Sequence, residues 1–486
     1  MLALIVSAGI GTGGCGGGDG ETADTGANGA GTAVPFSEPE RIRLSEGPIE
    51  LIAAEEKITV AGQDVRGRSY NGELVGPTLV IEPGETFYLN LHNELAEPTN
   101  LHYHGFHVSP LRPSDEVVHL EVEPGDTYQY EVTVPRDHDQ GSFWYHSHNH
   151  HTSEGQVFGG MSGVALIGTP KIPEGIDVAA DRVLALKDFQ VENGEIPLEG
   201  IDSGAPTTRT VNGLLEPHIE ATPGSVELWH LANVGADIFY EVELAQHQLY
   251  VLTEDGNPSG MSPQQRLTLP PGKRFDVLVV FDEVASYELK TLRYTTGKGG
   301  DEYPEARLAT VDVSGTPAED GISLEREAGL AAEGVPPLTV PAPRVKRLSE
   351  VENEEKFMIN GKVFDPGRID DAVELGVVED WLFINETDEE HPIHMHQDDF
   401  WVIEENGHPL KPTNQQDIVI VPPRGSIKFR IKYEDFPGEF VYHCHILNHE
   451  DHGMMAVIKV NDPQDEGSGA ADAPIHLHHD HSGHAH

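Results

Sequence analysis

The sequence predicts an all-β protein made of three similar sandwich domains, and two observations lead to this prediction. From Phe36 onward, short apolar runs alternate with Pro-Gly and Asn-Gly turns, and long amphipathic helical patterns are hard to find. Short runs of this kind with regular turn signals are typical of sandwiches and barrels. The second observation is an internal repeat of ~140 to 150 residues, which indicates three copies of one structural unit.

Each copy contains an Asn-Gly turn, a second turn ending in Gly, and a strand that ends in Asn. These features are Asn71-Gly72, Pro83-Gly84 and Leu91-His92-Asn93; Asn212-Gly213, Pro223-Gly224 and Trp229 to Asn233; and Asn360-Gly361, Leu375-Gly376 and Trp381 to Asn385. A later turn also recurs, at Pro124-Gly125-Asp126, Pro271-Gly272-Lys273 and Pro423-Arg424-Gly425. The predicted domains are residues 36–170, 171–343 and 344–462, and we interpret the Pro- and charge-rich stretch from Val335 to Lys356 as a linker.

Residues 1–35 are expected to be a leader and a flexible Gly-rich tether. The apolar run Leu2 to Ile10 is too short for a membrane span and resembles the core of a signal peptide. Gly13-Gly14-Cys15 resembles the end of a prokaryotic lipoprotein signal, with Cys15 as the acylated residue, although Thr12 stands where an aliphatic residue is usual. A disordered Gly-rich leader is the alternative.

Residues 463–486 form an acidic tail that carries six histidines: His476, His478, His479, His481, His484 and His486. Short His-rich tracts bind metals. This tail is therefore either a segment that captures copper or a disordered, adventitious chelator.

The charge balance narrows the class of partner. Acidic residues outnumber basic ones 82 to 31, and the net charge is −51. Such a field repels nucleic acid and anionic membranes, so neither is expected as a partner. A charge far beyond what solubility needs predicts a salt-adapted, halophilic protein, with an ordinary acidic exported protein as the alternative. Cys15 and Cys444 are the only cysteines, so no disulfide is expected.

The segment from Tyr442 to Met454 carries the strongest chemical signal. Its first residues are a predicted strand, so His443 and His445 face one way and Cys444 the other. A thiolate, an imidazole and a weak thioether, here Cys444, His449 and Met454, are ligands of a blue-copper site. The alternative is a buried free cysteine among structural histidines.

Three further clusters contain His-x-His pairs, whose spacing on a strand aims both imidazoles at one face. They are His102-Tyr103-His104-Gly105, Trp144-Tyr145-His146-Ser147-His148 and His391-Pro392-Ile393-His394-Met395-His396. His391 lies an odd number of residues from His394 and His396, so in an extended segment it points away from them, as a ligand of a different metal should. One such pair is a weak signal, but four clusters in complementary phase are a strong one.

With these four motifs the chain resembles the multicopper oxidases, the family of laccases, bilirubin oxidases and bacterial copper-efflux oxidases, from about Pro35 to Asn461. The resemblance implies three cupredoxin-like Greek-key β-sandwich domains and four copper ions: one type 1, one type 2 and two type 3. It assigns His391, Cys444, His449 and Met454 to type 1, His102 and His394 to type 2, and His104, His146, His148, His396, His443 and His445 to the type 3 pair. The trinuclear cluster then forms between domains one and three, and the middle domain is a spacer that shapes the substrate cleft.

The resemblance also implies a mechanism. Electrons from a reducing substrate enter at the exposed edge of His391 or His449, and the backbone of Cys444 carries them to His443 and His445, where O₂ is reduced to water. This reduction consumes protons. Glu450 matches a proton-relay carboxylate of bacterial members, and Asp115 stands where relatives place an acid near type 2 copper. A solvated surface acid is the alternative for both.

The choice of substrate depends on the methionines. There are only seven, and no Met-rich segment of the kind that would select Cu(I) through soft thioethers. We therefore expect a laccase-like oxidase of phenolic and aromatic reductants that acts as a monomer. It is expected to be exported and either extracellular or anchored to the outer face of the cytoplasmic membrane, which in a Gram-negative organism places it in the periplasm. A cuprous, Mn or Fe oxidase of copper homeostasis is the alternative, since the acidic surface attracts cations.

Two other function classes stay open. A copper-storage protein would not need a type 1 site wired to a trinuclear one. A copper nitrite reductase usually has two domains per chain and does not use these four motifs.

Overall fold

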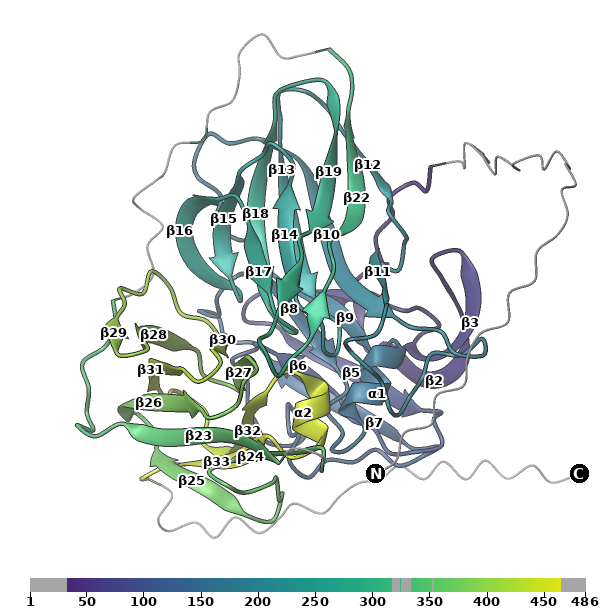
Figure 1. Cartoon of the computed structure of the whole chain (residues 1–486). Coiled ribbons are helices and arrows are strands. Elements are labelled where there is room, and N and C mark those ends of the chain that lie inside the picture. Colours follow the sequence, from purple (N-terminus) through teal and green to yellow (C-terminus); the bar gives the residue numbers. More distant parts are fainter. Residues whose placement is uncertain (1–32, 317–323, 325–333, 352–353, 465–486) are drawn as a thin grey trace, which may run out of the picture. The chain divides into compact units, whose positions relative to one another are not determined.

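The computed structural model describes residues 33–316, 324, 334–351 and 354–464 (Figure 1). The leader with Cys15 and the His-rich tail lie outside these residues, so both expectations stay predictions. The all-β prediction is confirmed, since the described part contains 33 strands but only two α-helices, α1 (Ser153–Gly159) and α2 (Leu447–Asp451), and the 3-10 helix η1 (Leu44–Glu46). None of these helices is long and apolar enough to cross a membrane.

The first domain consists of two sheets, with strand orders β3-β2-β5-β7 and β1-β4-β9-β8-β6. Their strands are β1 (Arg41–Arg43), β2 (Ile49–Val60), β3 (Gln63–Tyr70), β4 (Gly76–Ile81), β5 (Thr86–Asn93), β6 (His102–His104), β7 (Thr127–Thr133), β8 (Gly141–His146) and β9 (Ser162–Ile167). Apolar side chains such as Leu89, Leu91 and Tyr130 are buried in the core of this domain.

The middle domain has the sheets β11-β10-β13-β18-β15-β16 and β12-β22-β19-β14-β17, with a small β20-β21 hairpin. Figure 1 shows these strands in teal. They are β10 (Val178–Phe189), β11 (Thr208–Val211), β12 (His218–Ala221), β13 (Ser225–Asn233), β14 (Tyr240–Leu244), β15 (Leu249–Glu254), β16 (Asn257–Gln264), β17 (Leu267–Leu269), β18 (Arg274–Phe281), β19 (Ala285–Thr291), β20 (Tyr294–Thr295), β21 (Glu302–Tyr303) and β22 (Ala306–Val313).

The third domain repeats the plan with β24-β23-β26-β31-β28-β29 and β25-β33-β32-β27-β30. Its strands are β23 (Arg344–Val351), β24 (Lys356–Ile359), β25 (Ile369–Glu374), β26 (Val378–Asn385), β27 (His391–Met395), β28 (Phe400–Glu405), β29 (His408–Pro409), β30 (Ile418–Val421), β31 (Ser426–Lys432), β32 (Gly438–Cys444) and β33 (Met455–Asn461). The expected linker from Val335 to Lys356 is wrong in its second half, because β23 is part of this sheet.

The internal repeat has a physical basis in the asparagine that ends β5, β13 and β26. Asn93, Asn233 and Asn385 are buried, and each donates both side-chain N–H groups to two backbone carbonyls, over distances of 2.6 to 3.2 Å. Each also accepts a backbone N–H two residues ahead. An Asn at this position therefore satisfies a buried loop that would otherwise leave polar groups unpaired.

Strand pairing brings the histidine motifs together. β6 is antiparallel to β8, with His102 opposite His146, and β27 is antiparallel to β32, with His394 opposite His443. Residues directly opposite each other in an antiparallel pair share a face of the sheet. β32 then leads into α2, which carries His449, and β33 follows Met454.

Candidate metal centres

The first candidate centre contains only third-domain residues. The Nδ1 atoms of His391 and His449 lie 3.2 Å apart, and each is 3.6 Å from Cys444 Sγ. All three side chains are buried. Met454 is also fully buried, and its backbone carbonyl accepts the Cys444 N–H at 3.0 Å. The donor set of one thiol and two imidazoles beside a methionine fits a type 1 copper.

The second candidate centre contains eight histidines from the first and third domains, and the spacing of their nitrogens divides them into groups. His443 Nε2 lies 3.3 Å from His148 Nε2 and 3.2 Å from His396 Nε2. His445 Nε2 lies 3.2 Å from His104 Nδ1. His146 groups with His104 and His102, and His102 with His394 and His396. Nitrogens this close around a common point suit coordination of one ion better than mutual hydrogen bonds.

Several of these imidazoles have one nitrogen held by the protein and the other left free. His102 Nδ1 donates to the Asp115 carboxylate at 3.0 Å, His146 Nδ1 to the Ser147 carbonyl at 2.8 Å, and His394 Nδ1 to the Asp417 carbonyl at 2.9 Å. Such bonds fix the tautomer of a metal-ligating histidine and direct its other nitrogen to the ion.

The free nitrogens provide the test of fit for copper. The Nε2 atoms of His102, His146 and His394 are buried without a hydrogen-bond partner, which proteins rarely tolerate. Burial lowers the pKa of His146 to about 4 and the pKa of His148 to about 3, so both imidazoles are neutral, as metal ligands must be. The residues present therefore fit a buried cluster of metal ions.

The two acids predicted from the sequence lie beside these histidines. Glu450 Oε2 is 3.0 Å from His443 Nδ1, and Glu450 Oε1 is 3.6 Å from His148 Nδ1. Burial raises the pKa of Glu450, but the neighbouring imidazole of His148 and the hydrogen bond from His443 outweigh this effect and lower the pKa overall. Burial raises the pKa of Asp115 to about 7. Both acids are buried, so the alternative of a solvated surface acid is wrong, while their roles stay predictions.

Two residues close to the second centre were not anticipated. Asp417 is buried next to His104 and His394, and it forms an ion pair with the fully buried Arg274 of the middle domain. Arg274 thus connects the middle domain to the second centre, which the interpretation of that domain as a spacer that shapes the substrate cleft did not anticipate. The only feature of the sequence that could have indicated this contact is Arg274 itself, a charged residue directly after the recurring turn Pro271-Gly272-Lys273.

The structure also narrows the site of electron entry. His391 is fully buried, and its Nε2 lies 2.8 Å from Thr387 Oγ1. The His449 side chain is 8% exposed, and its Nε2 faces Glu389 Oε2 at 3.5 Å. Of the two histidines considered from the sequence, only His449 presents an edge to solvent.

Comparison with known proteins agrees with this geometry. Sequence models of the multicopper oxidases match residues 53–171, 185–313 and 338–464. The chain is 26% identical to a multicopper oxidase of Staphylococcus haemolyticus, over 80% of this chain and 83% of that protein. It is 24% identical to a laccase of Bacillus subtilis, over 81% and 90% of the two chains.

Among solved structures, the laccase-like multicopper oxidase CueO of an Ochrobactrum species superposes with a TM-score of 0.74 at 26% identity, covering 88% of this chain and all of the other. A metallo-oxidase from Campylobacter jejuni gives 0.73 at 25% identity, covering 88% and 97%. The chain belongs to the multicopper oxidase family. It is an oxidoreductase with three cupredoxin-like domains, and the family binds one type 1, one type 2 and two type 3 coppers.

Proposed function

We propose that the protein couples one-electron oxidation of phenolic and aromatic substrates to the four-electron reduction of O₂ to water. The observation that carries this proposal is the sequence of three buried residues, His443, Cys444 and His445, which face two different centres. The thiol of the first centre is thereby joined to two imidazoles of the second through adjacent backbone units. When bound, the coppers supply one-electron acceptance at the first centre and O₂ reduction at the second.

We assign the ligands by the family resemblance, and the close spacing of the histidine nitrogens supports this assignment. His391, Cys444, His449 and Met454 would hold type 1 copper, and His102 and His394 type 2. One type 3 copper would be held by His148, His396 and His443, and the other by His104, His146 and His445. Glu450 lies between two of these histidines, so it is placed to deliver protons to the second centre, and Asp115 orients His102.

The surroundings of His449 suit an aromatic donor. Phe357 stacks on the His449 ring with the centroids 3.9 Å apart, which leaves the Nε2 edge as the point of approach. A phenol that loses an electron also loses a proton, and Glu389 Oε2, 3.5 Å from this edge, is placed to accept it when the carboxyl is ionised, which its raised pKa favours above about pH 8. The substrate would therefore lose its electron to His449 and its proton to Glu389 at the same position.

The same carboxylate favours a second candidate function, oxidation of a metal ion. Burial, together with the neighbouring acids Asp301, Glu350 and Glu390, raises the pKa of Glu389 to about 8, so several carboxyl groups surround the point of electron entry. An acidic group of this kind attracts a divalent cation. The relatives include an iron transport multicopper oxidase of Saccharomyces cerevisiae, 23% identical over 84% of this chain.

A comparison of kcat/KM for a methoxyphenol and for cuprous ion on one fully copper-loaded sample tests the proposal. We expect the phenol to be preferred, and a clear preference for the metal ion would overturn the laccase-like assignment. Glu389→Gln should lower kcat/KM for both donors, more for the metal ion. Asp388→Asn is the matched control, because Asp388 pairs with Arg424 on the surface.

We further propose that the protein is exported and salt-adapted. The apolar run from Leu2 to Ile10 supports export, and the net charge of −51, which a salt-rich medium would screen, supports salt adaptation.

A further inference from the structure

The turn Gly272-Lys273-Arg274 of the middle domain packs directly against the second centre. Gly272 has φ +84°, and a Cβ there would lie 2.6 Å from Ile418 Cδ1, 3.1 Å from His104 Cε1 and 3.2 Å from His445 Nε2. A larger residue would be strained in this backbone conformation and would press on two candidate ligands. Gly272 is therefore needed for the backbone conformation of the turn, and it also keeps open the space beside two candidate ligands.

Arg274 joins all three domains at this point. Its guanidinium donates to both Asp417 oxygens, at 2.9 and 2.8 Å, and its Nε lies 3.4 Å from the Ser142 carbonyl of the first domain. Both charged groups are buried. A buried two-pronged Arg–carboxylate pair has a fixed geometry, which a lysine cannot reproduce.

Asp417 contacts two candidate ligands, His104 through its carboxylate and His394 through its backbone carbonyl. Its carboxylate Oδ1 lies 3.5 Å from His104 Nε2, and its backbone carbonyl accepts the His394 Nδ1–H at 2.9 Å. A carboxylate facing Nε2 favours a proton on that nitrogen, which leaves His104 Nδ1 free toward the centre. The carbonyl likewise leaves His394 Nε2 free.

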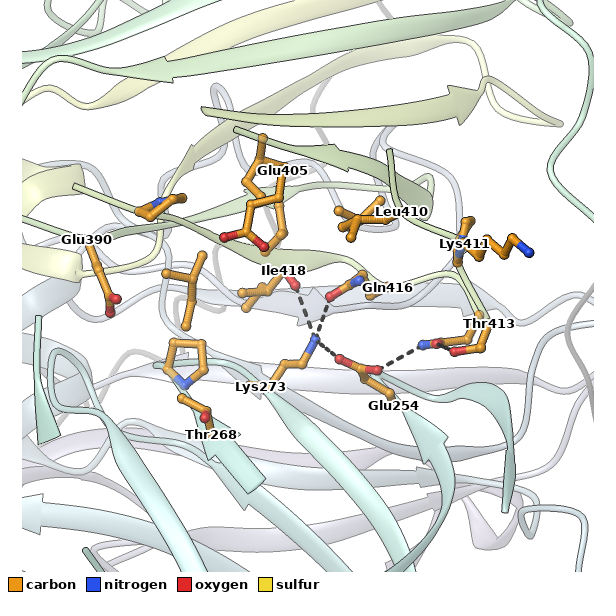
Figure 2. Close-up of a pocket in the computed structure, with 18 residues that line it drawn as sticks. Glu254, Thr268, Lys273, Glu390, Glu405, Leu410, Lys411, Thr413, Gln416 and Ile418 are labelled. Carbon is orange, nitrogen blue, oxygen red and sulfur yellow. Dashed lines mark hydrogen bonds and ion pairs between the residues drawn. The ribbon is translucent and has the colours of Figure 1, made fainter. Parts of the chain in front are cut away.

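Lys273 fixes the turn from its other side. Its Nζ donates to Asp255 at 2.8 Å, to Gln416 at 2.9 Å and to the Ile418 carbonyl at 3.2 Å. Figure 2 shows this ammonium group at the wall of a cavity of about 540 Å³, between residues of the middle and third domains. The turn is therefore attached to the segment Gln416–Ile418 on both sides of Asp417.

We propose that this turn is a positioning element for the trinuclear centre. Arg274, acting through Asp417, sets the ring orientation and tautomer of His104 and His394, and Gly272 provides the space in which His104 and His445 stand. The inference rests on the ligand assignment proposed above. It gives the middle domain, which has no ligand of its own, an indirect part in O₂ reduction, through the position of the ligands.

The variant Arg274→Lys keeps the charge and removes the two-pronged contact, and it should be studied as the copper-loaded full chain. We expect the blue absorption and its reduction by a phenol to stay as in the wild type. The EPR spectrum of type 2 copper should change, and reoxidation of the blue site by O₂ should slow about 10- to 100-fold, as for other partners of metal ligands. Arg182→Lys is the control, because Arg182 makes a similar pair with Glu227, at 2.7 and 3.1 Å, with no candidate ligand in contact.

Two further variants keep the proposal open to refutation if Arg274→Lys does not fold. Asp417→Asn retains the backbone carbonyl, so it should disturb the type 3 pair through His104 more than type 2 copper through His394. Gly272→Ala should reduce trinuclear copper content, whereas Gly125→Ala, at φ +85° with no atom within 4 Å of its Cβ, should not. Wild-type EPR spectra, copper content and reoxidation rates in the folded variants would overturn the proposal. These readouts do not depend on which reductant the enzyme uses.

Discussion

The two candidate copper centres are built in different ways. The first takes all its residues from the third domain, between His391 and Met454, and the strand β27 and the segment β32–α2 bring them together. The second takes histidines from two domains and is supported by an ion pair from the middle domain. The first centre is therefore local in the chain, whereas the second exists only when all three domains are packed.

Copper loading of the second centre should therefore require packed domain interfaces, whereas copper loading of the first should require only a folded third domain. A disturbance of the domain interfaces should empty the second centre while the first keeps its copper. The reverse loss, with the type 1 site emptied first, is not expected from interface changes. Each prediction below tests one side of this contrast.

The largest effect is expected from His146→Ala. The His146 Nε2 atom has no protein partner, so its loss removes one ligand of the second centre and leaves the first intact. The variant should keep a blue site that a phenol can reduce and that O₂ cannot reoxidise. Stopped-flow absorption measures both half-reactions, and O₂ reoxidation at the wild-type rate would refute the assignment of His146.

A smaller loss is expected from Glu450→Gln. The amide keeps the shape of the side chain between His148 and His443 but cannot carry a proton, so turnover should fall about 100- to 1,000-fold while copper content is unchanged. A solvent isotope effect larger than that of the wild type would accompany a proton-transfer step. Glu439→Gln is the control, since Glu439 lies at the surface with Lys459. Unchanged turnover of Glu450→Gln would remove it from the proton path.

The sequence predicted the local features of the two centres well, but it did not predict the contacts between domains that support the second centre. The strand phase of His443, Cys444 and His445 separates the two faces because side chains alternate along a strand. Arg274 and Asp417 lie 143 residues apart, and no local pattern connects them. The sequence did not predict β23 because its charged and apolar residues face the opposite way from the usual pattern of a strand. Lys346 is buried against the Trp381 ring and forms an ion pair with Asp371, while Val345 is exposed.

A pH effect is expected at the interface of the first and middle domains. His230 Nδ1 donates to Asp276 at 2.6 Å, and Asp276 accepts the Ser142 N–H at 2.9 Å. Burial lowers the pKa of His230, but Asp276 and Asp181 outweigh burial and raise it to about 9. A raised pKa gives stability that is complete below the unfolded value of about 6.5 and is lost as pH rises through about 9.

His230→Gln should therefore reduce the unfolding free energy by about 2 to 3 kcal/mol at pH 6 and by little above pH 9. Urea unfolding at the two pH values measures this difference. In the wild type, trinuclear copper should be lost before type 1 copper as the pH rises above 9. An equal destabilisation by His230→Gln at pH 6 and pH 10 would contradict the role of its charge.

The smallest effect is expected from salt. Molar salt screens repulsion to a few ångströms, so the unfolding midpoint and the retention of trinuclear copper should rise or hold in the range from dilute buffer to molar NaCl. The first centre, enclosed in one domain, should be less sensitive. Greater stability and activity in dilute buffer than in brine would argue against salt adaptation.

The connection between the two centres is tested most directly by the copper content, blue absorption and turnover of Cys444→Ser. The serine hydroxyl is a poor ligand for type 1 copper, whereas His443 on β32 and His445 directly after this strand keep their positions. We predict no blue absorption, no oxidation of a phenol, a retained copper content of the second centre and a retained EPR signal of type 2 copper. A Cys444→Ser protein that is still blue and still couples phenol oxidation to O₂ consumption would contradict this assignment.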